Sequence, residues 1–513
     1  MSADSGPLPS SEFALDSAFG FLRRHAPAVL VVSALLLVPC FWHTHIQAGD
    51  LGSHIYNAWL AQLVERQQVS GVIVVRQWNN VLFDLLVVHA ANAFGFVAAE
   101  RMVVPLVVLV FFWGGFSFLT CVSDRPPWAL TPFLFVLAYG YAFEMGFTNY
   151  YLSVGLAFVG LSAAWKGGAG NWCFALAIGA VTLLAHPLGF ALFAGVAVYF
   201  GLVRWVPRWI RVALLILVVG AFAALRFYFR ANASLLASWR PQSWLEVLGQ
   251  DQMNVYGHRY EVLSWFALAW GVCCAAGAAY DWVFRARKPS ALLSIAIELY
   301  VVTVIGTLCL PENFRTSLYA GWVGLLVSRL TLVTAMFGLL GLAALPLPRW
   351  SRRGAVLIAA VFAVFLYRDT GKLDRMETNA HALAQGLALG TRIVAVANAA
   401  DDWRVPFIYH SIDRACIGLC FSYGNYEASS LQFRVRALPG NAVVTTSVDQ
   451  SDDMSSGDYI VRAKDLPLIS IYQCDDRDWT QLCALPLRAG QKTEDPESEP
   501  GPVPAEDDAD SDQ

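Results

Sequence analysis

Long apolar runs are the feature of this sequence that most constrains its fold. The stretches Ala26–Trp42, Met102–Leu119, Val212–Ala224 and Ala355–Leu366 carry no charged residue. A helix of roughly 18 apolar residues crosses the ~30 Å hydrocarbon layer of a membrane, and the shorter runs need flanking aromatic residues to complete a span. Hydrophobic residues make up 57% of the chain and charged residues 14%, against about 25% charged in soluble proteins. Because one water-soluble core cannot bury such a surplus, the sequence predicts an integral membrane protein.

The apolar runs predict about eleven membrane-spanning helices. They cover approximately residues 27–44, 102–122, 128–144, 149–165, 171–186, 188–203, 211–228, 262–283, 290–310, 319–345 and 354–368. Basic residues gather in alternate short loops, on the side of Arg23 and Arg24, as cytoplasmic loops do. These loop residues are Arg125, Lys166, Arg204, Arg208, Arg211, Arg285, Arg287, Lys288, Arg349, Arg352 and Arg353. We therefore predict a plasma- or inner-membrane protein with a cytoplasmic segment 1–26 and an extracytoplasmic C-terminus.

The first apolar run fits an uncleaved signal anchor, with a cleaved signal peptide ending near Ala48 as the alternative. The outer loop that follows, residues 45–101, contains two amphipathic segments, His54–Gln68 and Trp78–Phe94. Both predict helices that lie at the membrane surface. The alternative is a further span at 81–99, which would place polar residues in lipid at a high cost. Those polar residues are Asp84, His89 and Asn92.

The predicted fold class is mostly α: a polytopic transmembrane bundle over residues 27–368 with a small extracytoplasmic α/β domain over 369–490. Within that domain Met376–Leu389 is predicted to be helical. The predicted strands are Arg392–Val396, Gln432–Ala437, Ala442–Thr446 and Leu468–Tyr472.

The last segment, residues 491–513, is acidic and predicted to be disordered. It explains the formal net charge of −4, because Lys492–Gln513 holds nine of the 39 acidic residues and one of the 35 basic residues. The rest of the chain then has 34 basic and 30 acidic residues, with no basic stripe of the kind that binds nucleic acid.

Four of the ten cysteines fall in the predicted outer domain: Cys416, Cys420, Cys474 and Cys483. An even number of cysteines in an oxidising compartment predicts two disulfides. Local pairing, 416 with 420 and 474 with 483, is the preferred connectivity, and the other two connectivities stay open. A zinc site of four cysteines is a further alternative, although the spacing of the second pair fits it poorly.

Ionisable residues gather at the predicted outer rim of the membrane, where such residues mark functional sites. The acidic and histidine residues are Asp50, Asp84, Glu144, His186 and Glu312. Six arginines on this side go against the usual charge bias: Arg76, Arg226, Arg230, Arg240, Arg259 and Arg315. Of these, Arg226, Arg230, Arg259 and Arg315 are the candidates for substrate binding. Guanidinium groups match phosphate oxygens, so we predict that this set binds a phosphate or pyrophosphate. For any single arginine, snorkelling to the interface or a local salt bridge is the ordinary explanation.

Asp50 is the strongest candidate for a catalytic residue. It follows the first span directly, where a carboxylate can act as a general base or ligate a metal. Its ordinary role would be to cap the helix that begins near Ser53. His54 and Glu144 would add metal ligands or orient an acceptor, although helix packing explains either of them equally well.

This arrangement resembles the GT-C superfamily of membrane glycosyltransferases. Members of that family have about eight to thirteen spans, a cytoplasmic N-terminus, a large first outer loop with two juxtamembrane helices, and often a soluble outer domain. The resemblance covers mainly residues 20–350 and places Asp50 at the position of the family's catalytic or metal-associated acid. Glu144 matches the second outer loop, where several members carry another acidic residue. The resemblance implies transfer of a sugar from a polyprenyl-phosphate donor to a lipid, glycan or protein acceptor.

The chain departs from the pattern of that family at several points. The first outer loop has no adjacent Asp-Glu pair, the second has no Asp-x-Asp, and the outer domain has no Trp-Trp-Asp-type motif. The cofactor therefore stays open, with a divalent metal as the candidate, and so does the donor sugar. The segment His410–Glu427 is dense in polar and aromatic residues, which suit either sugar binding or a disulfide-closed loop. A lipid or glycan transporter (a flippase) and a non-catalytic membrane scaffold are the alternative functions.

Overall fold

The computed structural model describes residues 14–232, 237–284, 291–316, 319–430, 432–475 and 477–493. The basic group Arg285, Arg287 and Lys288 and most of the predicted tail 491–513 lie outside these ranges. The chain forms two compact units. Among the described residues, unit 1 contains 14–42, 78–83 and 102–367, and unit 2 contains 43–77, 84–101 and 368–493.

Eight helices in the described part of the chain are long and apolar enough to cross a membrane, by length and composition. They are α1 (Ala14–Leu37), α4 (Phe96–Ser123), α9 (Pro187–Trp205), α10 (Arg208–Asn232), α12 (His258–Phe284), α13 (Ala291–Cys309), α14 (Leu326–Ala343) and α15 (Arg349–Gln385). The segments predicted as the fourth and fifth spans form α7 (Thr148–Lys166) and α8 (Ala169–Ala185), which do not belong to this set. These helices indicate a multi-pass membrane protein, and the count of eleven spans stays a prediction.

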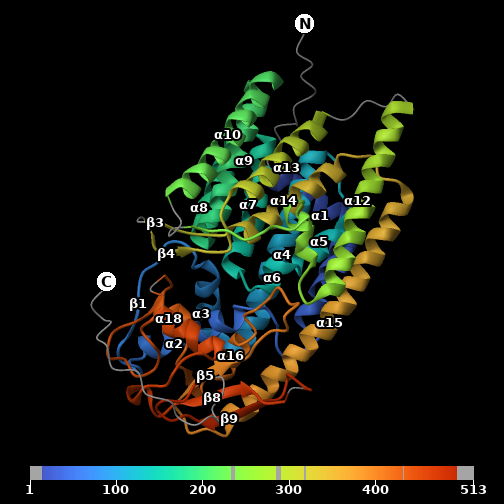
Figure 1. Cartoon of the computed structure of the whole chain (residues 1–513). Helices are drawn as coiled ribbons and strands as arrows, with labels where there is room; N and C mark the ends of the chain where they lie inside the picture. The colour runs from blue at the N-terminus through green and yellow to red at the C-terminus, as the bar shows by residue number, and fades with distance from the viewer. Residues whose placement is uncertain are drawn as a thin grey trace. The chain divides into compact units, whose positions relative to one another are not determined.

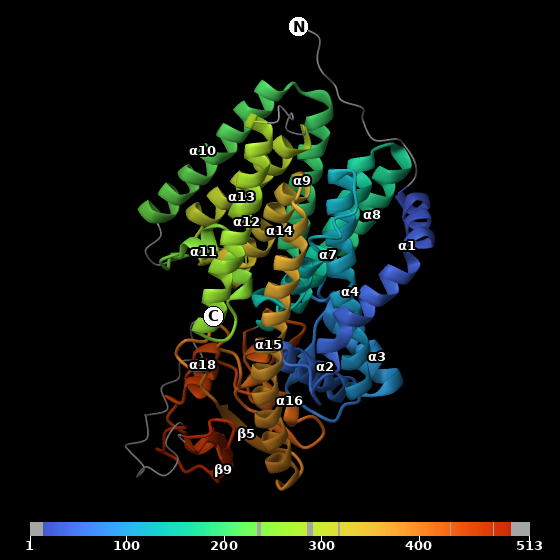
Figure 2. The ribbon, with the colours of Figure 1, turned by 90° about the vertical axis from the view of Figure 1, so that its right-hand side faces the viewer.

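Unit 1 is a helix bundle. Helix α7 packs against both α8 and α9, and α13 packs against α14 (Figure 1). Figures 1 and 2 both place α10 at the edge of this bundle, where it packs on α13. The side chains of α10 are largely exposed, with Ile216 at 66% and Leu217 at 68%. Apolar side chains exposed to this extent fit contact with lipid better than contact with water.

Two segments of unit 1 differ from the predicted spans. The span predicted at 128–144 is two short helices, α5 (Thr131–Ala138) and α6 (Tyr141–Glu144). Gly140 lies at the break, and a Cβ there would lie 2.6 Å from the carbonyl oxygen of Gln252. The span predicted from 319 begins as strand β4 (Tyr319–Val323), and α14 starts only at Leu326, after Leu325 with a positive φ of 53°.

The remaining elements of unit 1 are short. The 3-10 helix η1 (Val38–Cys40) follows α1, and α11 (Trp244–Val247) and η2 (Gln250–Met253) precede α12. Strands β2 (Ala237–Ser238), β3 (Asn313–Thr316) and β4 form an antiparallel sheet in that order.

Unit 2 combines helices with two small sheets. Its helices are α2 (Leu51–Glu65), most of α3 (Leu82–Phe94), the start of α4, the end of α15, α16 (His410–Ala415), α17 (Tyr426–Ser429), α18 (Val448–Ser456) and η3 (Ala463–Asp465). The main sheet has the order β6-β5-β8-β9, from Cys420–Ser422, Thr391–Val396, Ile469–Gln473 and Leu482–Pro486 (Figure 1). Strand β5 is parallel to β6 and β8, and β9 is antiparallel to β8. A second pair joins β1 (Val72–Val74) to β7 (Val435–Ala437).

The α/β character predicted for the C-terminal domain is confirmed, with differences in its elements. The strands predicted at Arg392–Val396 and Leu468–Tyr472 are β5 and β8, and only the end of Gln432–Ala437 is a strand. Residues 442–446 form an irregular, bent segment rather than the predicted strand, because the side-chain oxygen of Asn441 accepts from the amides of Val443 and Val444. The helix predicted at Met376–Leu389 is not separate, since α15 continues to Gln385 without a break.

The core of unit 2 lies on the main sheet. Val394 and Val396 of β5 pack with Tyr423, Met454 and Val461, all of which are buried. Burying such side chains contributes ~1.5–3 kcal/mol each. The local cysteine pairing is confirmed, because Cys416 bonds to Cys420 and Cys474 to Cys483.

Candidate functional site

Helix α2 places Asp50 and His54 in unit 2. Asp50 is at the N-cap position of this helix, but its side chain makes no capping hydrogen bond. The Asp50 side chain therefore does not cap the helix, the alternative role that the sequence allowed for it. Gly52 lets the start of α2 approach α16 closely, since a Cβ there would lie 2.1 Å from the carbonyl oxygen of His410.

Asp50 belongs to a chain of ionisable groups that runs through His410. The Nε2 atom of His410 lies 3.5 Å from Oδ1 of Asp50, and its Nδ1 atom lies 2.6 Å from Oδ2 of Asp413. The hydroxyl of Ser422 donates to the other oxygen of Asp413. His410 and Asp413 are buried, whereas 15% of the Asp50 side chain is exposed. A buried carboxylate thus orients the imidazole ring whose far nitrogen faces Asp50, the arrangement in which histidine transfers protons efficiently.

A second group surrounds His54, one turn along α2. The Nδ1 atom of His54 lies 2.8 Å from Oδ1 of Asp84 and 3.6 Å from Oε1 of Glu427. The hydroxyl of Ser53 donates to the same Glu427 oxygen at 3.0 Å. The structure thus brings together three of the predicted site residues, Asp50, His54 and Asp84.

The polar face of α2 is buried within unit 2, and the location of this helix at the membrane surface stays a prediction. Ser53, His54 and Asn57 are at most 6% exposed. Asn57 and Asn425 exchange hydrogen bonds of 3.1 and 2.7 Å between their side-chain amides. Buried polar groups need such partners, and here the C-terminal part of unit 2 supplies them.

Burial and clustered charge shift the pKa values of this site. Burial lowers the pKa of His54, but the carboxylates of Asp84 and Glu427 outweigh it and raise that pKa to about 10. Burial raises the pKa of Glu427 to about 7, against the effect of the His54 charge. Burial also lowers the pKa of His410, but the hydrogen bond to Asp413 outweighs it, so the pKa lies above its ordinary value. The site therefore holds protons that isolated side chains would have released at neutral pH.

A tyrosine hydroxyl completes the surroundings of Asp50. Burial and then the Asp50 charge raise the pKa of Tyr426 well above its ordinary value, so the phenol stays protonated and donates to the Asp50 carboxylate. Tyr409 also lies near Asp50, and desolvation followed by the Asp50 charge raises its pKa. The Asp50 carboxyl group thus faces the imidazole of His410 and the phenol of Tyr426.

The raised pKa of His54 predicts that the protein loses stability as the pH rises. The folded state binds the His54 proton more tightly than the unfolded state does, so this contribution is complete below pH 6.5 and is lost as the pH approaches 10. We expect the Tm in detergent to fall between pH 7 and pH 10, and to fall less in His54→Gln. The control His258→Gln changes a side chain that is 75% exposed and should keep the wild-type slope. Equal slopes in all three proteins would contradict the prediction.

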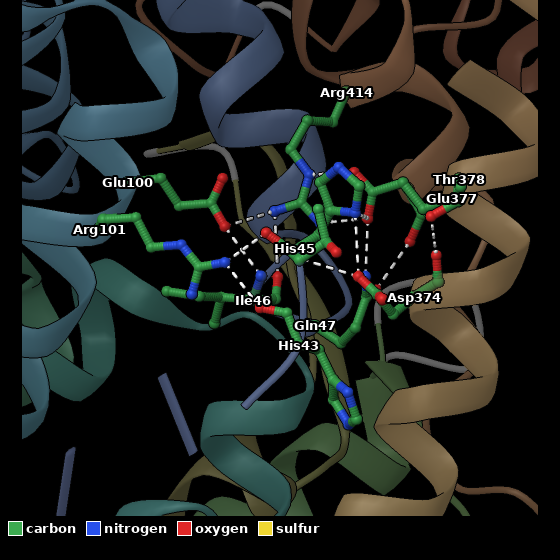
Figure 3. Close-up of polar contacts among 12 residues, drawn as sticks. His43, His45, Ile46, Gln47, Glu100, Arg101, Asp374, Glu377, Thr378 and Arg414 are labelled. Atoms are coloured by element: carbon green, nitrogen blue, oxygen red, sulfur yellow. Dashed lines mark hydrogen bonds and ion pairs between the residues drawn. The ribbon is translucent and has the colours of Figure 1, made fainter. Parts of the chain in front are cut away.

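The segment that leads into Asp50 is held by a buried ion cluster around Arg414, the residue after Asp413 in α16 (Figure 3). The Nε atom of Arg414 donates to Oε1 of Glu377 at 2.6 Å, and Nη2 pairs with the other oxygen. Its Nη1 atom donates at 3.0 Å both to Oε1 of Glu100 and to the carbonyl oxygen of Ile46. Gln47 donates to Glu377 at 2.7 Å.

The cluster continues through His45, which lies beside Asp374 in the same view (Figure 3). The amide of His45 donates to Oδ1 of Asp374 at 2.7 Å, and its Nδ1 atom lies 3.0 Å from the same oxygen. Arg101 donates to the carbonyl oxygens of His43 and Thr44. Residues 43–47 are thus fixed at several points, only three residues before Asp50.

The other predicted acids and histidine belong to unit 1, where each has a structural partner. Glu144 is 1% exposed and accepts from the Tyr256 hydroxyl at 2.7 Å. His186 caps α9, since its Nδ1 atom accepts from the amide of Leu188. Glu312 accepts from the Ser328 hydroxyl at 2.6 Å. These contacts support the packing role that the sequence left open for Glu144.

The predicted arginines also belong to unit 1. Arg226 and Arg230 lie over the ring of Trp239, with guanidinium carbons 4.9 and 5.6 Å from its centroid. Arg259 lies over Phe365 at 5.1 Å, and Arg315 is exposed on β3. Cation–π contacts hold guanidinium groups in place without using all their donors. Phosphate binding by this set stays a prediction.

Sequence reasoning did not select His410, Asp413 or Glu427 as site residues. The signal was the density of polar and aromatic residues in His410–Glu427, which matched no motif. Among the described residues, no group of three or more His, Cys, Asp or Glu side chains is arranged to hold a metal ion.

Comparisons with known proteins assign no family to this arrangement. No family profile matches the chain, and neither the curated proteins nor the solved structures give a match.

Proposed function

We propose that the protein is a membrane glycosyltransferase of the GT-C type, which passes a sugar from a polyprenyl-phosphate donor to an acceptor hydroxyl at the extracytoplasmic face. The observation that carries the proposal is the partly exposed Asp50 carboxylate, which faces His410 while Asp413 orients that ring. A multi-pass helical protein in which such a group follows the first apolar helix in the sequence suits chemistry on a lipid-linked substrate.

The chain segments that make up unit 2 support the proposed membrane topology. Residues 43–77 and 84–101 pack with residues 368–493 in this one unit. Segments that pack together must face the same side of the membrane. The first loop and the C-terminal domain therefore share a side, as the distribution of basic residues requires of two extracytoplasmic segments.

In the proposed reaction Asp50 takes the proton of the acceptor hydroxyl as the oxygen attacks the anomeric carbon of the donor. The bond from that carbon to the phosphate oxygen breaks, and the phosphate leaves with the electron pair. The products are the glycosylated acceptor and the polyprenyl phosphate, with the proton on Asp50. In its neutral form His410 then accepts this proton at Nε2, the ring nitrogen that faces Asp50. Such positioned general bases contribute about 10²–10⁴-fold to a rate.

The test is to supply the purified protein with a panel of radiolabelled polyprenyl-phosphate sugars together with membrane-lipid and glycan acceptors. We expect one donor to be consumed, with polyprenyl phosphate released in equal amount to the glycosylated product. Mass spectrometry of lipids that co-purify with the protein would narrow the panel beforehand. Movement of a lipid across liposomes without any covalent product would replace the proposal with the transporter alternative. A folded protein that neither binds nor consumes any donor would favour the scaffold alternative.

A further inference from the structure

Unit 1 contains a cavity of about 500 Å³ between α9, α10, α13 and α14. All four helices belong to the set that is long and apolar enough to cross a membrane, and Figure 2 shows them grouped in one region of the bundle. Most of the lining is aliphatic or aromatic, with residues such as Leu192, Leu215, Val218 and Phe222. This volume falls within the range of ~300–1,000 Å³ that is typical of small-molecule sites.

The cavity is elongated along the helices. Its lining on α9 extends from Leu188 to Leu202, which is about 21 Å at the 1.5 Å rise per residue of an α-helix. A space that is long relative to its volume and lined by hydrocarbon fits one extended apolar chain better than a compact ring system.

One end of the cavity is polar. Arg211 of α10, Glu298 of α13 and Tyr199 of α9 meet there. The Tyr199 hydroxyl donates to Oε2 of Glu298 at 2.6 Å. Arg211 approaches the other carboxylate oxygen only to 3.9 Å, through Nη2.

Arg211 keeps donors available at this end. Its side chain is 10% exposed, and its Nε and Nη1 atoms are buried with no hydrogen-bond acceptor among the described residues. Buried guanidinium donors without acceptors cost free energy. The other arginine of the lining, Arg329, is engaged differently, since it donates to the carbonyl oxygen of Gly324 and lies over Phe147 at 4.3 Å. An occupant with acceptor oxygens at the Arg211 end would satisfy the available donors.

We propose that this cavity binds an amphiphile with one long apolar chain and an anionic head, a carboxylate or a phosphate, which Arg211 holds at the end formed with Glu298 and Tyr199. The Nε and Nη atoms of a guanidinium group form the fork that recognises two oxygens of such a head. A free fatty acid and a lipid phosphate share this chemistry. The site is separate from the Asp50 site of unit 2, and its occupancy does not depend on sugar transfer.

Native mass spectrometry of the delipidated full chain in detergent tests the proposal with three probes: oleate, oleyl phosphate and oleyl alcohol. We expect Arg211→Gln to weaken binding of one or both anionic probes about 10-fold or more and to leave oleyl alcohol unchanged. Loss with oleate alone identifies a fatty-acid site, and loss with oleyl phosphate alone identifies a lipid-phosphate site. The matched control is Arg208→Gln, which removes an exposed arginine one turn earlier on α10 and should bind as the wild type does.

A second variant tests the apolar part and keeps the proposal falsifiable if Arg211→Gln folds poorly. Gly195 lines the cavity, and a Cβ there meets no atom within 4 Å. Gly195→Leu should therefore fold, fill part of the cavity and weaken all three probes, whereas Gly201→Leu, at an equally open position of α9 outside the lining, should not. Wild-type affinity for the anionic probes in Arg211→Gln, or wild-type binding in Gly195→Leu, would overturn the proposal.

Discussion

Asp50→Asn is expected to lower the rate of sugar transfer by about 10²–10⁴-fold, the contribution of a positioned general base. Asparagine has nearly the same shape as aspartate but cannot accept the proton of an acceptor hydroxyl. The fold should survive, because the Asp50 side chain does not cap α2 and is 15% exposed. The measurement is the initial rate of transfer from the labelled donor at equal concentrations of folded protein.

The control for this variant is Asp401→Asn, which makes the same chemical change at an exposed position of unit 2 and should leave the rate unchanged. The affinity for the donor separates loss of catalysis from loss of binding, since removing a general base lowers the rate without weakening donor binding. A wild-type rate in Asp50→Asn would remove Asp50 from the mechanism. Equal loss in both variants would point to a general effect of charge rather than to catalysis.

The helical part of the fold was accessible from the sequence because its signal is local. Each residue of an apolar run contributes to the prediction of a membrane-spanning helix, so α4, α9 and α13 lie close to their predicted ranges. The break between α5 and α6 was not accessible, because it depends on the contact between Gly140 and Gln252. Neither residue differs in type from many others in the bundle, so only the packed structure distinguishes them.

The candidate site was accessible only in part, for the same reason. Asp50 and His54 were selected because they follow an apolar run, and their positions in the sequence are informative. The sequence positions of their partners are not informative. Glu427, for example, accepts a hydrogen bond from Ser53 although it lies 374 residues later in the chain. The amphipathic pattern of α2 is also the same whether its polar face contacts water or a second polar surface. Whether the polar face of α2 contacts water or protein depends on where residues 410–427 lie in the fold, and no local sequence pattern gives that position.

Arg414→Met is expected to destabilise unit 2 by about 3–5 kcal/mol, the cost of removing one partner from a buried ion pair. Methionine fills much of the space, but it leaves the carboxylates of Glu377 and Glu100 buried without their counter-charge. Those side chains are 1% and 9% exposed, so water cannot compensate. The free energy of unfolding in detergent, measured with denaturant, reports the loss.

The exposed pair of Arg434 with Glu65 provides a matched control in the same unit. Its atoms lie 3.3 Å apart, similar to those of the Arg414 cluster, but Glu65 is 48% exposed, so Arg434→Met should cost about 0–1 kcal/mol. Adding Glu377→Gln to Arg414→Met should recover part of the loss, because a neutral amide is less costly to bury than an uncompensated charge. Equal losses in Arg414→Met and Arg434→Met, or no recovery in the double variant, would contradict this assignment. If it holds, transfer should also slow in Arg414→Met, because the cluster fixes residues 45–47 just before Asp50.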